Sequence, residues 1–214
     1  MIEAGVPEER ISVCGSPRYD PAWVERVVAE LGGGDSDPPD DGRVPIVFFA
    51  TKKVYDFDFE RLMGWLGHVA AHPRVDLVIQ PHPRGQREAT FASLARLPNV
   101  TVDAKTPASL LIDRADMVST LVSSVMVEAV VRGREILYPR FANTVTTRFD
   151  EAGACVALER MEDTHAAIDA FLAGERVARE NCDAFLRETA WGGGDPDTIA
   201  RVCAGMTQIA ARPR

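Results

Sequence analysis

The stretch that decides the fold is DRADMVSTLVSSVMVEAVVRGREILYPRF, residues 113–141. Its apolar run at residues 118–122 is short and bounded like a strand, and apolar residues then recur at helical spacing until Gly133. A second apolar run follows this glycine. The pattern predicts one strand–helix–strand step of an open α/β sheet, with Ser123 and Ser124 at the corner where the helix begins.

The serine pair has two interpretations. A serine is a common N-cap, because its side chain satisfies a free backbone N–H group of the first helical turn. The same turn carries the positive end of the helix dipole, and serine hydroxyls add donors, so the corner also suits a phosphate. Residues 113–141 alone favour the cap, and the rest of the chain bears on the choice.

The remainder of the chain repeats the alternation of strand and helix. Strands are predicted at residues 44–50, 75–80, 100–102 and 155–158, and helices at residues 21–31, 58–71, 87–97, 108–115, 161–173, 177–189 and 197–211, with a loop or short helix at 143–152. Residues 44–50 are apolar throughout, as in a strand buried on both faces. The pattern predicts an α/β fold with a doubly wound, mostly parallel, Rossmann-like sheet and extra C-terminal helices.

Three parts of the chain are expected. Residues 32–42, GGGDSDPPDDG, are the most linker-like segment, because they combine glycine, proline and acid without an apolar residue to bury. Residues 1–42 are therefore interpreted as the remnant of a preceding domain, including a strand at ISVCG (residues 11–15), and a linker. Residues 43–175 make the Rossmann-like domain, and residues 176–214 make the C-terminal helices.

Composition excludes several classes of function. The 214-residue chain is 46% hydrophobic and 26% charged, which is ordinary for a globular protein, and its net charge of −8 argues against nucleic-acid binding. Its four cysteines form no CxxC pair, so we expect reduced thiols and no metal site. No apolar run approaches the roughly 20 residues of a membrane helix. We expect a cytoplasmic protein without a transmembrane segment, either free or peripherally attached to the inner membrane.

Polar side chains follow four of the predicted strands. They are Thr51, Lys52 and Lys53 after the first strand, His82 and Arg84 after the second, Ser123 and Ser124 after the fourth, and Arg140 after the fifth. Ligands of open α/β sheets bind at the carboxyl ends of the strands. The sequence therefore predicts one locally positive pocket for an anionic small molecule that bears phosphate.

Each of these residues also has a simpler interpretation. Lys52 and Lys53 could be solvated surface charges, and His82, which lies between two prolines, could belong to a rigid turn. As a ligand contact, His82 could donate to a phosphate oxygen and offset charge on a leaving phosphate. Glu128 shares a helix face with Ser124, because the two are four residues apart, and could accept hydrogen bonds from a ribose or be solvated.

Two motifs carry a resemblance to a known group of enzymes. VIQPHPRG (residues 78–85), followed later by SSVMVEAVVRGREILYP (residues 123–139), resembles the carboxyl-terminal, donor-binding half of glycosyltransferases with two facing Rossmann-like domains, the GT-B fold. A His-Pro motif followed by a Ser-Ser motif is similar to that of bacterial sialyltransferases, capsule Kdo transferases and CDP-glycerol glycerophosphotransferases. These enzymes use donors activated by a cytidine nucleotide.

The resemblance implies a role for each motif. His82 would contact the donor phosphate as the catalytic residue of this half, Ser123 and Ser124 would bind phosphate, and Glu128 would lie near the ribose. The donor, a CMP- or CDP-linked sugar or polyol phosphate, would be a substrate, and no cofactor is expected. Such transferases are about twice this length, and their amino-terminal half carries the acceptor site. The chain is therefore expected to be a donor domain that needs this missing domain or a partner chain.

Two other classes of function stay open. A nucleotide-sugar epimerase of the UDP-N-acetylglucosamine 2-epimerase type shares the two-domain layout and the serine–glutamate corner. An epimerase would be expected to show a His-Arg pair after the first strand, and TKKV at residues 51–54 does not supply one. The third class is a non-catalytic module that binds a nucleotide or a protein partner.

Overall fold

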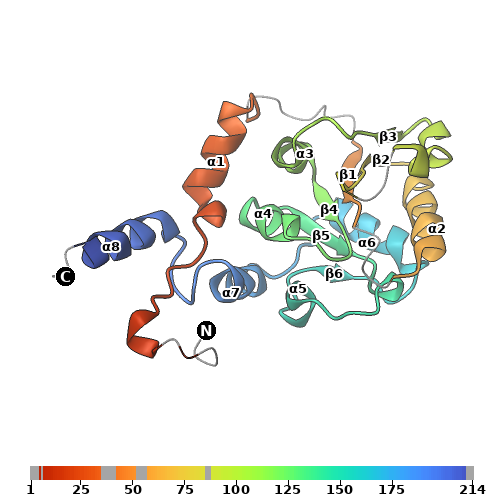
Figure 1. Cartoon of the computed structure of the whole chain (residues 1–214). Coiled ribbons are helices and arrows are strands. Elements are labelled where there is room, and N and C mark those ends of the chain that lie inside the picture. Colours follow the sequence, from red (N-terminus) through yellow and green to blue (C-terminus); the bar gives the residue numbers. More distant parts are fainter. Residues whose placement is uncertain (1–4, 6, 35–41, 52–56, 85–87, 211–214) are drawn as a thin grey trace.

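The computed structural model describes residues 5, 7–34, 42–51, 57–84 and 88–210 as one α/β fold (Figure 1). Six strands form a parallel sheet in the order β3-β2-β1-β4-β5-β6. Their bounds are Val44–Phe49 (β1), Val75–Gln80 (β2), Val100–Val102 (β3), Met117–Ser119 (β4), Glu135–Tyr138 (β5) and Val156–Ala157 (β6). The predicted doubly wound, Rossmann-like sheet is confirmed.

Helices cover both faces of the sheet (Figure 1). One face carries α2 (Phe59–Ala70) and α6 (Asp163–Leu172), and the other carries α3 (Ala108–Arg114), α4 (Val125–Val131), the short α5 (Arg148–Glu151) and α7 (Arg179–Thr189). Helix α1 (Pro21–Glu30) packs against α3, whereas α8 (Thr198–Ala210) projects away from the sheet. In the described part of the chain, no helix is long and apolar enough to cross a membrane.

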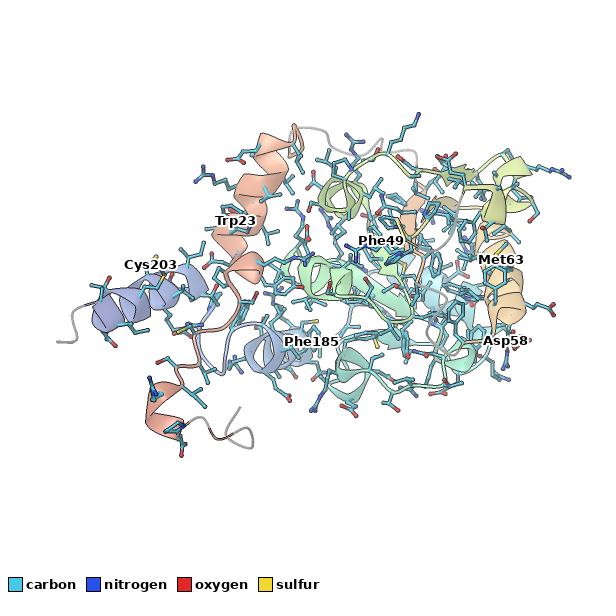
Figure 2. The ribbon with its side chains drawn as sticks, in the orientation of Figure 1. Trp23, Phe49, Asp58, Met63, Phe185 and Cys203 are labelled. Atoms are coloured by element: carbon cyan, nitrogen blue, oxygen red, sulfur yellow. The ribbon has the colours of Figure 1, made fainter. Side chains whose placement is uncertain are left out.

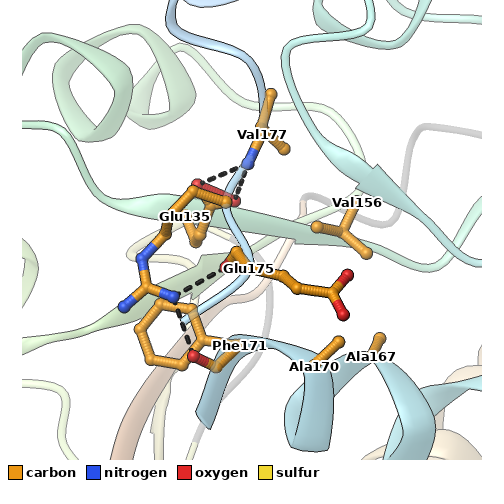
Figure 3. Close-up of a pocket in the computed structure, with 8 residues that line it drawn as sticks. Glu135, Val156, Ala167, Ala170, Phe171, Glu175 and Val177 are labelled. Atoms are coloured by element: carbon orange, nitrogen blue, oxygen red, sulfur yellow. Dashed lines mark hydrogen bonds between the residues drawn. The ribbon is translucent and has the colours of Figure 1, made fainter. Parts of the chain in front are cut away.

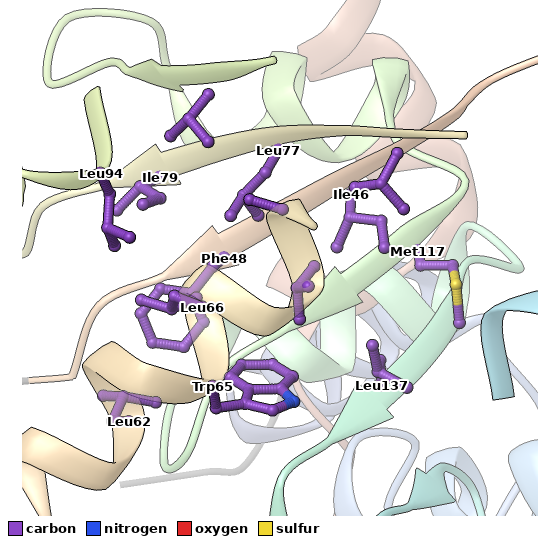
Figure 4. Close-up of a cluster of buried hydrophobic side chains, with 14 of the residues drawn as sticks. Ile46, Phe48, Leu62, Trp65, Leu66, Leu77, Ile79, Leu94, Met117 and Leu137 are labelled. Carbon is purple, nitrogen blue, oxygen red and sulfur yellow. The ribbon is translucent and has the colours of Figure 1, made fainter. Parts of the chain in front are cut away.

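Strand β1 is the centre of the packing, because its side chains are buried on both faces of the sheet. Phe48 points toward α2, where its ring meets Trp65 edge-on at 6.1 Å between centroids (Figure 4). Val47 and Phe49 point to the opposite face, into the apolar cluster that also contains Phe185 of α7 (Figure 2). Alternation along one buried strand thus fixes the position of both helical layers.

Hydrogen bonds join a segment near the start of the described chain, residues 16–20, to a segment near its end, residues 190–199. The Ser16 N–H donates to the Ala190 carbonyl at 2.7 Å, and the Trp191 Nε1–H donates to the Tyr19 carbonyl at 3.2 Å. The buried carboxylate of Asp20 caps α1 and also accepts the Ile199 N–H at 3.1 Å. These bonds hold the segment before α1 against the segment between α7 and α8.

Some predicted boundaries are wrong. Residues 11–15 form no strand, since their described neighbours offer loop carbonyls and not a strand edge. In place of the helix predicted at 87–97 the structure has two 3-10 turns, Glu88–Phe91 and Leu94–Arg96. Each turn buries one apolar side chain in the core beside α2, Phe91 from the first and Leu94 from the second. The strand predicted at 118–122 is β4, which ends at Ser119.

The contact between α2 and α6 gives a first prediction. Trp65 is fully buried, and its Nε1–H donates to the Thr164 hydroxyl of α6 at 2.9 Å. Trp65→Phe removes this bond and leaves unfilled space, so the free energy of unfolding should fall by about 1–3 kcal/mol. Chemical denaturation followed by circular dichroism measures the loss. The matched control is Trp23→Phe on α1, at a side chain 42% exposed, where the change should stay within about 0.5 kcal/mol. Equal losses in the two variants would contradict this packing.

Candidate functional site

The sheet order places a crevice beside β1. The chain leaves β1 toward β2 and β3 on one side, and returns to pair β4 with β1 on the other before adding β5 and β6. The order therefore reverses between β1 and β4. Ligands of doubly wound sheets bind outside the carboxyl ends of the strands at this reversal. The ends of β2, β1, β4 and β5, where the polar residues were predicted to gather, are consecutive along this edge.

Thr51 joins the end of β1 to the loop that follows β4. Its buried hydroxyl lies 3.3 Å from the Thr120 hydroxyl and accepts the Val122 N–H at 3.4 Å. Because this threonine holds the loop from inside, its role in the structure is to position the serine corner. The predicted contact between Thr51 and a ligand stays a prediction. Lys52 and Lys53 lie outside the described residues.

The serine pair lies directly before α4. Ser124 is the N-cap residue, but its side chain makes no capping bond, and the Ser123 hydroxyl accepts the Val125 N–H at a long 3.4 Å. The Tyr19 hydroxyl donates to the Ser124 carbonyl at 3.3 Å, so the segment before α1 packs against this corner. The simple N-cap interpretation therefore does not account for Ser124, whose exposed hydroxyl has no bond within the described residues.

Glu128 is the least expected residue of the corner. It lies on α4, one turn beyond Ser124, and is only 7% exposed, yet its carboxylate has no hydrogen-bond or ion-pair partner within the described part of the chain. The buried side-chain atoms that lack a partner do not include the carboxylate oxygens of Glu128, so the carboxylate still reaches solvent and the solvated alternative stays open. A carboxylate that reaches solvent without a protein partner at this place can accept hydrogen bonds from a ligand.

His82 follows β2 with a defined ring orientation. The backbone N–H of Arg84 donates to its Nδ1 at 3.0 Å, so the neutral ring carries its proton on Nε2. His82 is partly exposed, and Nε2 has no protein partner among the described residues. The two prolines thus hold a ring whose second nitrogen can donate. Arg84 itself is exposed, and its guanidinium makes no ion pair with any of the described residues.

Arg140 has a different environment from the one predicted. Its guanidinium is held by the carboxylates of Asp150 and Glu159, and the Asp150 side chain is only 4% exposed. The Asp150 hydrogen bonds are the main reason why the pKa of Arg140 lies above its ordinary range. Its charge is therefore already balanced by carboxylates. Its predicted phosphate contact stays a prediction.

A groove of about 510 Å³ opens at the serine corner. Its lining combines residues that carry hydroxyl groups with apolar residues. The lining residues are Val122, Ser123, Ser124, Met126, Val127, Val145, Thr146, Thr147, Arg148, Phe149, Phe185 and Thr189. Residues 145–148 and α7 also line this groove, and they were not predicted from sequence. The run of threonines in NTVTTR (residues 143–148), shortly after β5, was a signal that could have indicated the first of these.

A second pocket, of about 160 Å³, lies at the amino-terminal end of the strands, where β5 and β6 begin (Figure 3). Glu135 accepts the Val177 N–H at 3.1 Å, and Arg176 lies over the Phe171 ring at 3.8 Å. Burial raises the pKa of Glu135 above its ordinary range, and the Val177 bond partly offsets this. These contacts anchor the connection between α6 and α7, away from the predicted site.

No protein-family model matches the sequence, and no curated protein matches it significantly. Solved structures match its fold. A structure from Listeria monocytogenes assigned as a UDP-N-acetylglucosamine 2-epimerase aligns with 100% of this chain and 57% of its own, with a TM-score of 0.67 and 17% identity. UDP-GlcNAc 2-epimerase from Neisseria meningitidis, solved bound to UDP-GlcNAc, gives a TM-score of 0.61 at 12% identity over 97% of this chain and 57% of its own.

A third match is the wall teichoic acid polymerase TagF soaked with CDPG, with a TM-score of 0.52 and 17% identity over 95% of this chain and 51% of its own. Glycosyltransferases occur among the other matching structures. At these identities the likeness shows the fold, which is that of one half of a GT-B architecture. The chain aligns with 45–57% of the length of these structures, which is about half.

The bond network of Thr51 gives the second prediction. Thr51→Val keeps the side-chain shape but removes the hydroxyl that holds the loop of residues 120–124, so the protein should lose about 1–2 kcal/mol of stability. The amide protons of residues 122–125 should exchange faster, which NMR measures. Thr101→Val, at an exposed position of β3, is the matched control and should leave both quantities unchanged. Unaltered exchange in Thr51→Val would show that the hydroxyl does not position the corner.

Proposed function

We propose that this chain is the donor-binding domain of a transferase that uses a nucleotide-activated sugar or polyol phosphate. The observation that carries the proposal is Glu128, a largely buried residue whose carboxylate has no partner among the described residues, one turn from the exposed Ser124 hydroxyl at the reversal point of the sheet. A ribose offers two adjacent hydroxyl donors to a carboxylate, and a phosphate accepts from serine hydroxyls. A nucleotide supplies both groups at a fixed spacing.

Each predicted residue then takes a role in binding the donor. Ser123 and Ser124 donate to a phosphate, Glu128 accepts from the ribose, and the His82 Nε2–H donates to a phosphate oxygen from the end of β2, which β1 separates from β4. Lys52, Lys53 and Arg84 would add positive charge to this edge of an acidic protein. Thr51 acts indirectly, since it holds the serine corner in place.

The chemical step follows from where charge develops. When the sugar or polyol phosphate leaves the nucleotide, negative charge accumulates on the remaining phosphate. A hydrogen-bond donor of the protein that lies close to this phosphate stabilises the charge in the transition state more strongly than in the bound substrate. This difference lowers the barrier. His82 is suited to this, because Nδ1 is fixed by the Arg84 N–H and Nε2 is left to act on the ligand. The acceptor and its base would be supplied by a second α/β domain, in a longer chain or a partner chain.

We further propose a cytidine nucleotide and a role in bacterial surface polysaccharide synthesis such as capsule, in the cytoplasm or at the inner face of the membrane. The His-Pro and Ser-Ser motifs support this choice, as does the fold similarity to TagF. The second candidate is an epimerase-like domain that binds a UDP-sugar. It is favoured by the higher TM-scores, 0.67 and 0.61, of the two epimerase structures.

Nucleotide titration distinguishes the candidates. We expect the purified chain to bind CDP and CMP more tightly than UDP and ADP in calorimetry, and Glu128→Gln to weaken binding about tenfold or more, since a ribose hydroxyl would lose its charged acceptor. Similar losses are expected for His82→Ala and for Ser123→Ala combined with Ser124→Ala. UDP preference with the same sensitive residues would favour the epimerase-like domain.

Matched controls separate the site from general effects. Glu60→Gln and Ser93→Ala change the same residue types at exposed positions of α2 and of the turn before β3, so they should leave nucleotide affinity unchanged. Folding of every variant is checked by circular dichroism. Absence of binding by the folded wild-type chain to all four nucleotides, with or without an added amino-terminal domain, would refute the proposal and leave the partner-binding module.

A further inference from the structure

Three of the chain's four histidines meet between α2 and α6, on the face of the sheet away from the groove. The rings of His68 and His165 stack at 4.2 Å between centroids, with 9° between their planes. The ring of His72 meets His165 edge-on at 5.1 Å. This cluster takes no part in the proposed function, and nothing in the packing of the two helices requires titratable rings at these positions.

Hydrogen bonds define where the protons lie in the neutral cluster. His165 Nε2 lies 2.8 Å from the His68 carbonyl, which can only accept, so His165 carries a proton there. The Arg74 N–H donates to His72 Nδ1 at 3.2 Å, so neutral His72 carries its proton on Nε2 and donates it to Asp169 at 3.2 Å. The Nε2 atom of His68 is buried without a partner. A second proton on His72 would remove the Arg74 bond.

We propose that the stacked rings of His68 and His165 form a pH-sensitive latch, which fastens α6 to α2 when both rings are neutral and releases α6 when both are protonated. Two positive charges at the distance of the stack repel each other, and partial burial strengthens the repulsion. Protonation of both rings would therefore push them apart and separate the two helices.

The charged groups around the stack do not cancel this effect. Glu162 and Asp169 of α6 are the carboxylates that face it, and both are exposed, so solvent screens their attraction. Asp163 is paired with Arg160. From α2 only His72 faces the stack, and its Nε2 is directed to Asp169. The nearest carboxylates are thus either exposed to solvent or already paired with another side chain.

The direction of the pH effect follows from His68. Burial, and then the charge of His165, lower the pKa of His68 below its ordinary value of 6.5, and Glu162 offsets this only in part. The unfolded chain consequently binds this proton more readily than the folded chain. The stabilising contribution is complete above the ordinary pKa and is lost as the pH falls through it toward the folded value.

Release of α6 would affect the groove, because α6 is connected along the chain to a helix that lines it. Helix α6 leads directly to Val177, which is anchored on Glu135, and then to α7. Helix α7 supplies Phe185 and Thr189 to the wall of the groove. A loosened α6 therefore loosens the support of that wall in acid.

His68 and His72 are four residues apart, as are His165 and Asp169. This spacing also occurs in metal sites. Here the two stacked rings lie in nearly parallel planes, so their nitrogens do not converge on one point. Among the described residues, no group of three or more His, Cys, Asp or Glu side chains could hold a metal ion. Protonation is the reaction that the geometry supports.

Hydrogen exchange of the full chain between pH 7.5 and pH 5.5, corrected for the intrinsic rate, tests the latch. We expect the protection of α6 to fall about fivefold, while the protection of α4 changes less than about twofold. In His165→Gln, whose amide can still donate to the His68 carbonyl, the selective loss should be clearly smaller, because only the burial of His68 then opposes its protonation. His82→Gln, which changes the histidine outside the cluster, should keep the wild-type pattern.

Several outcomes would overturn the latch. One is an equal loss of protection in α4 and α6, because this would indicate global unfolding. Another is a selective loss of unchanged size in His165→Gln; should this variant fail to fold, His68→Phe, which removes the titrating ring itself, must abolish the loss. A third is a rise in the melting temperature of the wild-type chain with zinc at pH 7.5, absent in His165→Gln, since a metal would then join the helices.

Discussion

The burial of β1 on both faces is the constraint on which the rest of the structure depends. A strand with Phe48 on one side and Val47 and Phe49 on the other needs a neighbouring strand at each edge and a helical layer on each face. Strands β2 and β4 supply the edges. The reversal of strand order beside β1 follows from this arrangement, and with it the crevice at the carboxyl ends.

The same strand determines the local geometry of the candidate site. Thr51 follows β1 into the interior, where its hydroxyl holds the loop that leads to α4. That loop places Ser124 in solvent and, one turn later, Glu128, whose carboxylate has no partner among the described residues. A largely buried position of α4 thus carries an acidic residue that no described ion pair explains. Polar residues of this kind are typical of functional sites.

Much of this could be predicted from sequence, because it depends on local periodicity. Apolar runs and helical spacing indicated every strand of the sheet, and the carboxyl-end rule placed the polar residues at one edge. What depends on distant partners could not be predicted. The ion pairs of Arg140 involve Asp150 and Glu159, and the burial of Glu128 depends on how α4 packs. The chain at residues 11–15 has the composition of a strand, but the described elements beside it, the segment at Ala190 and Trp191 and helix α8, are not strands.

The central claim is that the corner between β4 and α4 binds the phosphate and ribose of a nucleotide. The most direct measurement is a map of backbone amide NMR shifts of the ¹⁵N-labelled chain during addition of CDP. We expect the largest changes at residues 122–128 and at His82, with small changes around Glu135 at the opposite edge. Changes centred on the pocket at Glu135 and Phe171, or spread evenly over the chain, would contradict the claim.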